Sequence, residues 1–426
     1  MNNAIYNSLV SQRQEISTLT SKYLVTRGLE SKLRSALSSD LIKVITGPRR
    51  AGKSLLALQC LKGSHFGYVN FEDNTLPVEL DTDELLKNID DVFQFPKIIF
   101  FDEIQLLPRW EQFLNKLHRR GYNIIVTGSN SHLLSGEFSS SLTGRHLALE
   151  LLPLSFSEFL SKPQYLRSSP TDNAELLTLD LFQRYWSRGG FPEVSLGKED
   201  PKEYLSLLFN SIVFRDIVQR FKLRNPQSVV TFLSLMIEEP STRFSANNIR
   251  KILPEPRLSV TTIIKYLNMA KNAYLLFELQ PFFAAPRKRV KADRKLYIID
   301  HALASARDFG VSEKLGATLE NIIFMELVRR GHTPNEELFY FQTPKGYEVD
   351  FLVRDNKSAT NLLQVSYDIS SMKTLERELR ALTEAAHITA AKELTIITYN
   401  QQKRMKYDGF DIDIVPAYQW LISQRR

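Results

Sequence analysis

Over the first 150 residues, stretches with apolar residues at helical spacing alternate with short runs of consecutive apolar residues. This pattern predicts helices that alternate with strands. Leu29, Leu33 and Leu37 recur at helical spacing, so we expect residues 1–40 to be helical. Five short apolar runs follow, each trailed by a loop or a helix-like stretch: Leu41–Thr46, Gly67–Phe71, Lys97–Phe101, Asn123–Thr127 and His146–Leu152. Short apolar strands separated by helices are typical of a parallel sheet with helices on both faces.

The pattern changes after this region. Residues 170–225 look helical and rich in leucine and aromatic residues, and residues 226–285 look like several short helices. A strand is expected at Lys295–Ile299. The remaining expected elements are a helix (314–330), three strands (338–341, 347–353, 361–366), a helix (371–387) and a strand (393–399). The chain therefore reads as an α/β domain, a helical region and an α+β C-terminal region.

Composition narrows the class of protein. The chain has 426 residues, 43% of them hydrophobic and 24% charged, which excludes a mostly disordered or fibrous protein. One cysteine, Cys60, excludes an internal disulfide framework. Residues 1–17 lack the apolar core of a signal peptide, and no apolar run has membrane-spanning length, so we expect a cytoplasmic protein. The net charge of +7 permits an anionic partner such as nucleic acid.

The strongest chemical signal is a phosphate-binding loop directly after the first apolar run. The segment fits the pattern GxxxxGK[ST], and with the next residue it gives our expected nucleotide-binding set: Gly47, Pro48, Arg49, Arg50, Ala51, Gly52, Lys53, Ser54 and Leu55. Glycines let backbone N–H groups face phosphate oxygens, and a helix starting near Lys53 adds its positive end. We expect Lys53 to contact the β- and γ-phosphates and the Ser54 hydroxyl to bind Mg²⁺.

A second signal is the pair of carboxylates that ends the third apolar run. Asp102 and Glu103 follow Ile98–Phe101, and unpaired charge is not tolerated inside a sheet, so both should lie at its carboxyl edge. We expect Asp102 to hold Mg²⁺ through water and Glu103 to act as the base that polarises the attacking water. We also expect the strand that carries them to neighbour the loop.

Two further elements are more ambiguous. Asn130 or Ser129, after the fourth run, could reach the γ-phosphate or the water, or could simply form a turn. Arg145 could stabilise transition-state charge in its own subunit or in a neighbouring one, or could be a surface arginine. The orientations of Arg49 and Arg50 stay open.

Taken together, these segments resemble a prokaryotic family of AAA+-type ATPases with a C-terminal domain of uncharacterised function. The resemblance rests on GPRRAGKS, IIFFDEIQLLPRWE, IIVTGSNSHLLS and SLTGRHLALELLPLSFSEF in this order, with Tyr185–Pro192, Gly316–Leu327 and Glu348–Val353 beyond them. It implies an ATPase domain with N-terminal helices (1–165), a helical lid or connector (166–225), a winged helix (226–310) and a degenerate restriction-endonuclease-like domain (311–426). ATP is expected as the nucleotide on the same ground.

DNA is a candidate partner of the winged-helix region. Ser259 could cap a helix that enters a major groove, followed by a basic stretch within residues 287–295: Arg287, Lys288, Arg289, Lys291, Arg294 and Lys295. The alternative is an interdomain spacer with a solvated basic loop.

The last region poses the question of nuclease activity. Glu320 and Asp350 occupy two positions that a metal-dependent nuclease of this type needs, but Gln364 and Ser366 stand where Glu-x-Lys is required. A hard cation prefers several charged oxygens, so we predict poor Mg²⁺ binding and no cleavage of nucleic acid.

These observations predict an Mg²⁺-dependent ATPase whose turnover rearranges its C-terminal domains. Two alternatives remain: a nucleotide-gated DNA-binding protein or protein-interaction module with little turnover, and a nuclease, which the sequence disfavours. An unknown protein partner or an oligomer is compatible with all of them.

Overall fold

A computed structural model of the chain describes residues 3–21, 25–77, 79–131, 144–162, 174–197, 199–253, 258–283, 292–307, 314–355 and 358–423. The chain divides into two compact units. The first comprises Met1–Leu154, Ser161–Arg167 and Asn272–Tyr274, and the second comprises Ser155–Leu160, Ser168–Lys271 and Leu275–Arg426. The finer boundaries expected at 165, 225 and 310 stay predictions.

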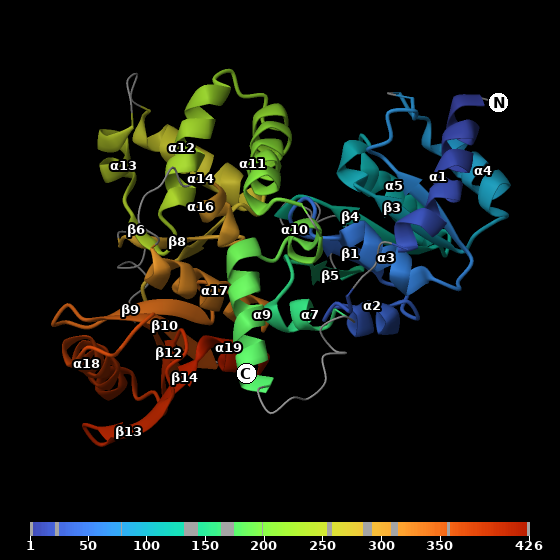
Figure 1. Cartoon of the computed structure of the whole chain (residues 1–426). Helices are drawn as coiled ribbons and strands as arrows, with labels where there is room; N and C mark the ends of the chain where they lie inside the picture. The colour runs from blue at the N-terminus through green and yellow to red at the C-terminus, as the bar shows by residue number, and fades with distance from the viewer. Residues whose placement is uncertain are drawn as a thin grey trace. The chain divides into compact units, whose positions relative to one another are not determined.

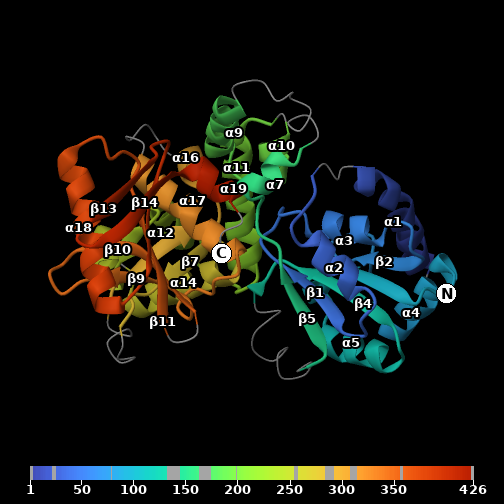
Figure 2. The same ribbon diagram turned by 90° about the horizontal axis from the view of Figure 1, so that it is seen from below.

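The first unit is built on a five-stranded parallel sheet. Its strands follow the order β2-β3-β4-β1-β5. In chain order its elements are α1 (Asn3–Ser21), α2 (Glu30–Ala36), β1 (Ile42–Thr46), α3 (Lys53–Leu61), β2 (Phe66–Asn70), α4 (Thr82–Phe93), β3 (Ile98–Asp102), the 3₁₀ turn η1 (Ile104–Leu106), α5 (Trp110–Arg119), β4 (Asn123–Gly128) and β5 (His146–Glu150). Helices α3 and α5 lie on opposite faces of the sheet (Figure 2).

The central apolar runs form this sheet because they are buried on both faces, whereas β5 is only partly buried. The central strands carry uninterrupted buried residues such as Val44, Phe100 and Ile125, which join one core with the inner sides of α3, α4 and α5. All five predicted strands are confirmed within two residues at each end. Strand β4 separates β1 from β3, so the expectation that the acid-bearing strand neighbours the loop's strand is wrong.

The second unit begins with helices. They are α7 (Phe156–Leu160), α9 (Ala174–Arg188), α10 (Pro192–Leu196), α11 (Pro201–Ser211), the π-helical turn η3 (Ile212–Gln219) and α12 (Pro226–Glu238). A three-stranded antiparallel sheet of order β6-β8-β7 follows, with two helices inserted. Its elements are β6 (Thr242–Phe244), α13 (Ala246–Ile252), α14 (Val260–Asn272), β7 (Leu276–Leu279) and β8 (Arg294–Ile298). The purely helical interpretation of 226–285 missed β6 and β7.

A mixed six-stranded sheet completes the second unit, in the order β13-β14-β12-β11-β10-β9. It belongs to the orange and red part of the ribbon in Figure 1. Its elements, with two helices before them, are α16 (Ala302–Arg307), α17 (Leu315–Arg329), β9 (Leu338–Gln342), β10 (Glu348–Asp355), β11 (Ser358–Val365), α18 (Met372–Thr389), β12 (Glu393–Thr398), β13 (Lys403–Tyr407), β14 (Phe410–Pro416) and α19 (Ala417–Ile422). Helices α17 and α18 both pack on β11. None of the helices in the described ranges has the length and apolar character needed to cross a membrane.

Candidate functional site

The loop between β1 and α3 is tightly folded. Gly47 has φ of 148°, and a Cβ there would lie 2.0 Å from the carbonyl oxygen of Leu151, so no other residue fits. Gly52 has φ of 92° and starts α3. Between them the N–H of Ala51 donates to the carbonyl of Pro48 at 3.3 Å. The glycines of the motif are thus required by backbone conformation and by close approach.

Lys53 folds back over this loop. Its Nζ donates to the carbonyls of Gly47 at 3.2 Å and Pro48 at 3.0 Å, and lies 3.6 Å from Oε1 of Glu103. The side chain is only 4% exposed. Because two of its partners are neutral carbonyls, a phosphate oxygen would be a stronger acceptor for the same ammonium group.

Asp102 ends β3 at the carboxyl edge of the sheet and is held by three hydroxyls. Its Oδ1 accepts from Ser54 Oγ at 2.9 Å and from Thr127 Oγ1, and its Oδ2 accepts from Tyr68 at 3.3 Å. Burial, with the nearby carboxylate of Glu103, raises the pKa of Asp102 to about 6. Ser54 and Asp102, which we expected to hold Mg²⁺, are thus hydrogen-bonded to each other, and their role as metal ligands stays a prediction.

Glu103 is held in an unusual backbone conformation. It has φ of 52° and ψ of 47°, a left-handed geometry that is strained for a residue with a side chain. Its N–H donates to Thr127 Oγ1 at 3.0 Å, and its carboxylate accepts from Gln105. Burial by itself would raise the pKa of Glu103, but the charge of Lys53 and the Gln105 hydrogen bond overcome it and keep the pKa below its ordinary value. Glu103 is thus a charged base beside the loop.

The end of β4 contributes through a residue that the sequence did not single out. Thr127 lies between the loop and the acids and bonds to both Asp102 and the backbone of Glu103. Ser129 is buried, and its hydroxyl interacts with Glu103. Asn130 is half-buried at the same edge of the sheet, and its role stays a prediction.

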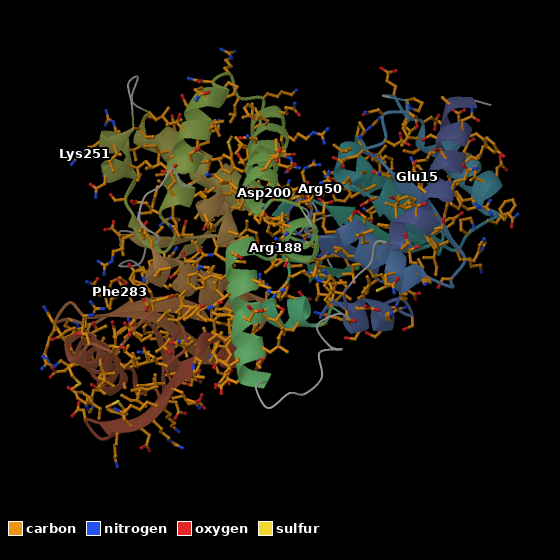
Figure 3. The ribbon with its side chains drawn as sticks, in the orientation of Figure 1. Glu15, Arg50, Arg188, Asp200, Lys251 and Phe283 are labelled. Carbon is orange, nitrogen blue, oxygen red and sulfur yellow. The ribbon has the colours of Figure 1, made fainter. Side chains whose placement is uncertain are left out.

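The arginines that the sequence singled out lie at different places in the first unit. Arg145 is exposed, and its carbonyl accepts from the N–H of Ile42 at the amino end of β1, the edge opposite the loop. This position does not fit a role for Arg145 in its own subunit's site, and a role in a neighbouring subunit or that of a surface arginine both stay open. Arg49 pairs with Glu72 at 2.8 Å, and Arg50 is exposed (Figure 3).

Arg27 supports the loop from the segment before β1, although no sequence motif marks it. It is 5% exposed, and it donates to the carbonyls of Ala51 at 2.8 Å and Leu152 at 2.6 Å. The sequence analysis also missed Tyr68 on β2, because its contact with Asp102 follows from the order of the strands in the sheet. Leu55 is half-buried in the first turn of α3.

This set of groups fits a magnesium–nucleotide complex. Ser54 and Asp102 place hard oxygens within hydrogen-bond distance of each other beside the loop. Within the described ranges, no group of three or more His, Cys, Asp or Glu side chains forms a metal cage.

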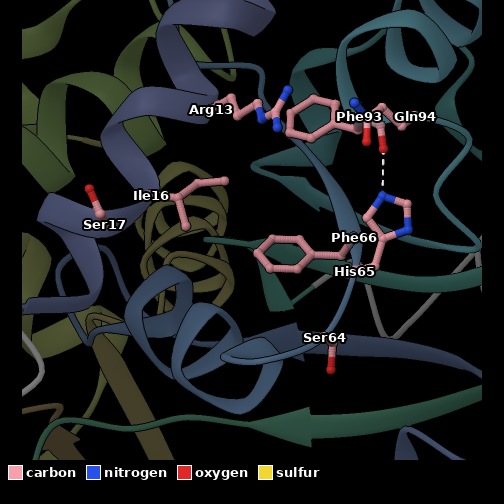
Figure 4. A pocket seen from close by; sticks show the side chains of 8 residues that line it. All are labelled: Arg13, Ile16, Ser17, Ser64, His65, Phe66, Phe93 and Gln94. Atoms are coloured by element: carbon pink, nitrogen blue, oxygen red, sulfur yellow. Dashed lines mark hydrogen bonds between the residues drawn. The ribbon is translucent and has the colours of Figure 1, made fainter.

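A separate hollow of about 330 Å³ lies elsewhere in the first unit (Figure 4). His65 Nε2 donates to the carbonyl of Phe93 across it at 2.7 Å. The hollow lies at the amino end of β2, at the edge of the sheet opposite the loop of residues 47–54. It is therefore separate from the candidate phosphate site. Its lining residues are Arg13, Ile16, Ser17, Ser64, His65, Phe66, Phe93 and Gln94.

The basic stretch after β7 falls partly outside the described residues, which begin again at 292. Arg294 pairs with Glu278 at 3.0 Å, and Lys295 is 3% exposed among carboxylates. The expectation that Lys295 contacts DNA phosphates is therefore wrong, because its charge is buried and paired. Arg287, Lys288, Arg289 and Lys291 lie outside the described residues.

Comparisons with known proteins agree with this geometry. Residues 39–160 match the AAA domain, residues 179–314 match a domain of unknown function (DUF8612) and residues 315–420 match another (DUF4143). The uncharacterised protein MJ1544 of Methanocaldococcus jannaschii is 36% identical over 94% of this chain and 91% of its own length. The chain belongs to the same family as MJ1544. An uncharacterised protein of Haemophilus influenzae is 30% identical over 90% of this chain and 95% of its own.

Among solved structures, a Walker-type ATPase of Pyrococcus abyssi resembles the chain, with a TM-score of 0.40 and 16% identity over 66% of this chain and 95% of that one. The match of residues 39–160 to the AAA domain places, in this member of the MJ1544 family, an AAA-type domain over the five-stranded parallel sheet. The further domains have no assigned function.

Proposed function

We propose that this protein binds ATP with Mg²⁺ and hydrolyses it at the loop of residues 47–54. The observation that carries the proposal is the convergence of Lys53, Glu103 and the Ser54–Asp102 pair at one edge of the sheet. The ammonium of Lys53 would leave the carbonyls of Gly47 and Pro48 and take β- and γ-phosphate oxygens.

The reaction would use Glu103 as its base. Its lowered pKa keeps it ionised at neutral pH, so it accepts a proton from a water that attacks the γ-phosphorus. The bond between that phosphorus and the bridging oxygen breaks, giving ADP and phosphate. Mg²⁺, when bound, would offset negative charge on the phosphate oxygens, with Ser54 and Asp102 as its protein-side oxygens.

Thr127 would position both acids. Its hydroxyl donates to Asp102 and accepts from the N–H of Glu103, so it fixes the turn that follows β3. The left-handed conformation of Glu103 is maintained by this bond. Asn130 and Arg145, the latter from a neighbouring subunit, complete the proposed site.

The test is ATP turnover of the wild type beside two variants. Lys53→Ala should lose nucleotide binding, and Glu103→Gln should bind ATP but release little phosphate. Lys62→Ala and Glu79→Gln, at exposed positions of the same unit, are matched controls that should behave as the wild type. Normal turnover in both site variants would exclude the proposed site.

A second candidate function, nucleotide-dependent DNA binding, is favoured by α14. The chain from α12 to β8 forms helices α13 and α14 and a three-stranded sheet of order β6-β8-β7, and the winged helix expected at 226–310 stays a prediction. Ser259 caps α14 by accepting from the N–H of Thr262 at 3.1 Å. One face of α14 is exposed and carries Thr261, Ile264, Lys265 and Asn268.

DNA binding is tested by mobility shifts at two salt concentrations with and without ATP. Lys265→Ala should weaken the complex and reduce its salt dependence, whereas Lys392→Ala, exposed elsewhere in the unit, should not. Lys251, exposed on α13 (Figure 3), is a second position to substitute. Equal shifts for wild type and Lys265→Ala would remove this function from α14.

A further inference from the structure

A buried lysine lies at the centre of three carboxylates in the second unit, far along the chain from the phosphate loop. Nζ of Lys295 is 2.8 Å from Glu320 Oε1, 2.7 Å from Glu348 Oε1 and 2.9 Å from Asp350 Oδ1. The lysine comes from β8, Glu320 from α17, and Glu348 and Asp350 from β10. Three elements thus converge on one ammonium group.

The ammonium group is saturated by these contacts. An ammonium carries three donors, and here three carboxylates accept at hydrogen-bond distance. The side chain of Lys295 is 3% exposed and that of Asp350 is 8% exposed. A charge removed from water to this extent requires such pairing.

The carboxylates are fixed from behind as well. Tyr297 donates to Glu320 Oε1 at 2.7 Å, and the N–H of Val365 donates to Asp350 Oδ2 at 2.9 Å. Glu348 also accepts from Arg243 at the rim of the cluster. The positions of the three acids are therefore set by hydrogen bonds that do not depend on Lys295.

Burial alone would lower the pKa of Lys295, but Asp350, Glu320 and Glu348 raise it well above its ordinary value. The pKa of Glu320 is raised by its own burial and by the charge of Asp350. The ammonium group of Lys295 therefore stays charged, and the raised pKa of Glu320 reduces the negative charge of the cluster without a metal ion.

We propose that Lys295 is the built-in cation of this cluster, that it excludes divalent ions from Glu320, Glu348 and Asp350, and that removing its ammonium opens a divalent-cation site. The oxygens that surround Nζ are the hard ligands that Mg²⁺, Mn²⁺ or Ca²⁺ take. An ammonium and a divalent ion cannot share the same three oxygens, because like charges in a buried place repel strongly. Gln364 accepts from the backbone N–H of Asp350 at 3.3 Å and its side chain interacts with Glu378, so it adds no charge of its own to the cluster.

The experiment measures Mn²⁺ binding to the full-length, nucleotide-free chain by the loss of the free-Mn²⁺ electron-spin signal. The wild type should bind no Mn²⁺ that depends on Asp350. Lys295→Met should gain one Mn²⁺ per chain, at least about tenfold tighter than any site of the wild type. The double variant Lys295→Met with Asp350→Asn should lose it, and Asp102→Asn should not affect it.

Lys271→Met is the matched control. Lys271 also pairs with a buried acid of the same unit, Glu278 at 3.1 Å, but Arg294 shares that acid, so no new ion should bind. Mn²⁺ binding by the wild type that Asp350→Asn abolishes would overturn the proposal. So would a folded Lys295→Met that gains no ion.

Folding of the variant is controlled by refolding it with and without Mn²⁺. Recovery of folded Lys295→Met only in the presence of Mn²⁺ supports the proposal, because the ion then replaces the ammonium group. Failure to recover it in Mn²⁺, under conditions where Lys271→Met refolds, contradicts it.

Discussion

Each unit of this protein places a lysine against buried carboxylates, and the two lysines are held in opposite ways. Lys53 rests on two carbonyls and is 3.6 Å from Glu103, whereas Lys295 lies within 2.9 Å of three carboxylates. A cation bonded mainly to neutral acceptors can exchange them for a charged ligand. A cation that already pairs with three carboxylates gains nothing from exchanging them for one charged ligand. The same residue types are therefore proposed to make a binding site in one unit, and they form a closed ionic cluster in the other.

The largest expected effect is on ATP turnover, and it distinguishes the acid beside the phosphate loop from the acids around Lys295. Glu103→Gln should lower ATP turnover about 10²–10⁴-fold, the range for removal of a general base. Glu320→Gln, the same change in the second unit, should leave turnover within about twofold of the wild type, because its carboxylate bonds to Lys295 and Tyr297 of that unit. Phosphate release under saturating ATP measures both. Equal losses in the two variants would abolish the distinction.

The next effect compares the two lysines by stability. Lys295→Met should lower the free energy of unfolding by about 3–5 kcal/mol, because three carboxylates lose their shared cation. Lys53→Met should lower it by only about 1 kcal/mol, because Lys53 bonds to two neutral carbonyls and lies 3.6 Å from Glu103. Urea unfolding of both variants gives the comparison, and a larger loss for Lys53→Met would reverse our interpretation.

A third effect comes from the raised pKa of Asp102. The folded protein takes up a proton near pH 6, whereas an unfolded aspartate does so near 3.8, so this group destabilises the fold as pH rises between those values. The penalty should reach about 3 kcal/mol above pH 6. Asp102→Asn should remove it, so the stability gained by the variant should grow from pH 4 to pH 6 and then level off. A gain independent of pH would contradict the burial of a charged Asp102.

The smallest effect concerns the support of the loop. Arg27→Lys keeps the charge but loses the two-pronged contact with Ala51 and Leu152, so ATP affinity should fall about tenfold. Arg13→Lys is the control, because Arg13 donates to Val92 away from the loop. Titration of a fluorescent ATP analogue measures both, and unchanged affinity in Arg27→Lys would show that the loop holds its shape without it.

The sequence predicted the first sheet well because its central strands are buried on both faces and therefore continuously apolar, as in Ile98–Phe101. The positions of the loop and of its two acids were also predicted from the sequence. The loop conformation requires glycine at fixed places, and a charge cannot stand inside a buried strand. Strand order was not readable, so the contributions of Tyr68 and Thr127 to Asp102 were missed.

Long-range pairing explains the errors in the second unit. Lys295 looked like part of a solvated basic stretch, yet the three acids that bury it stand 25–55 residues later. Strands β6 and β7 are short and flank helices, so helical periodicity dominated there. Arg27 carries no motif because its partners are carbonyls, which every residue has.

The most direct test of the central claim is a crystal structure of the protein with Mg²⁺ and a non-hydrolysable ATP analogue. Our account predicts the triphosphate against the backbone of residues 47–54, with Lys53 Nζ moved from the carbonyls of Gly47 and Pro48 onto phosphate oxygens and Glu103 facing the γ-phosphorus. An analogue bound elsewhere, or bound at the loop with Lys53 still on those carbonyls, would contradict it.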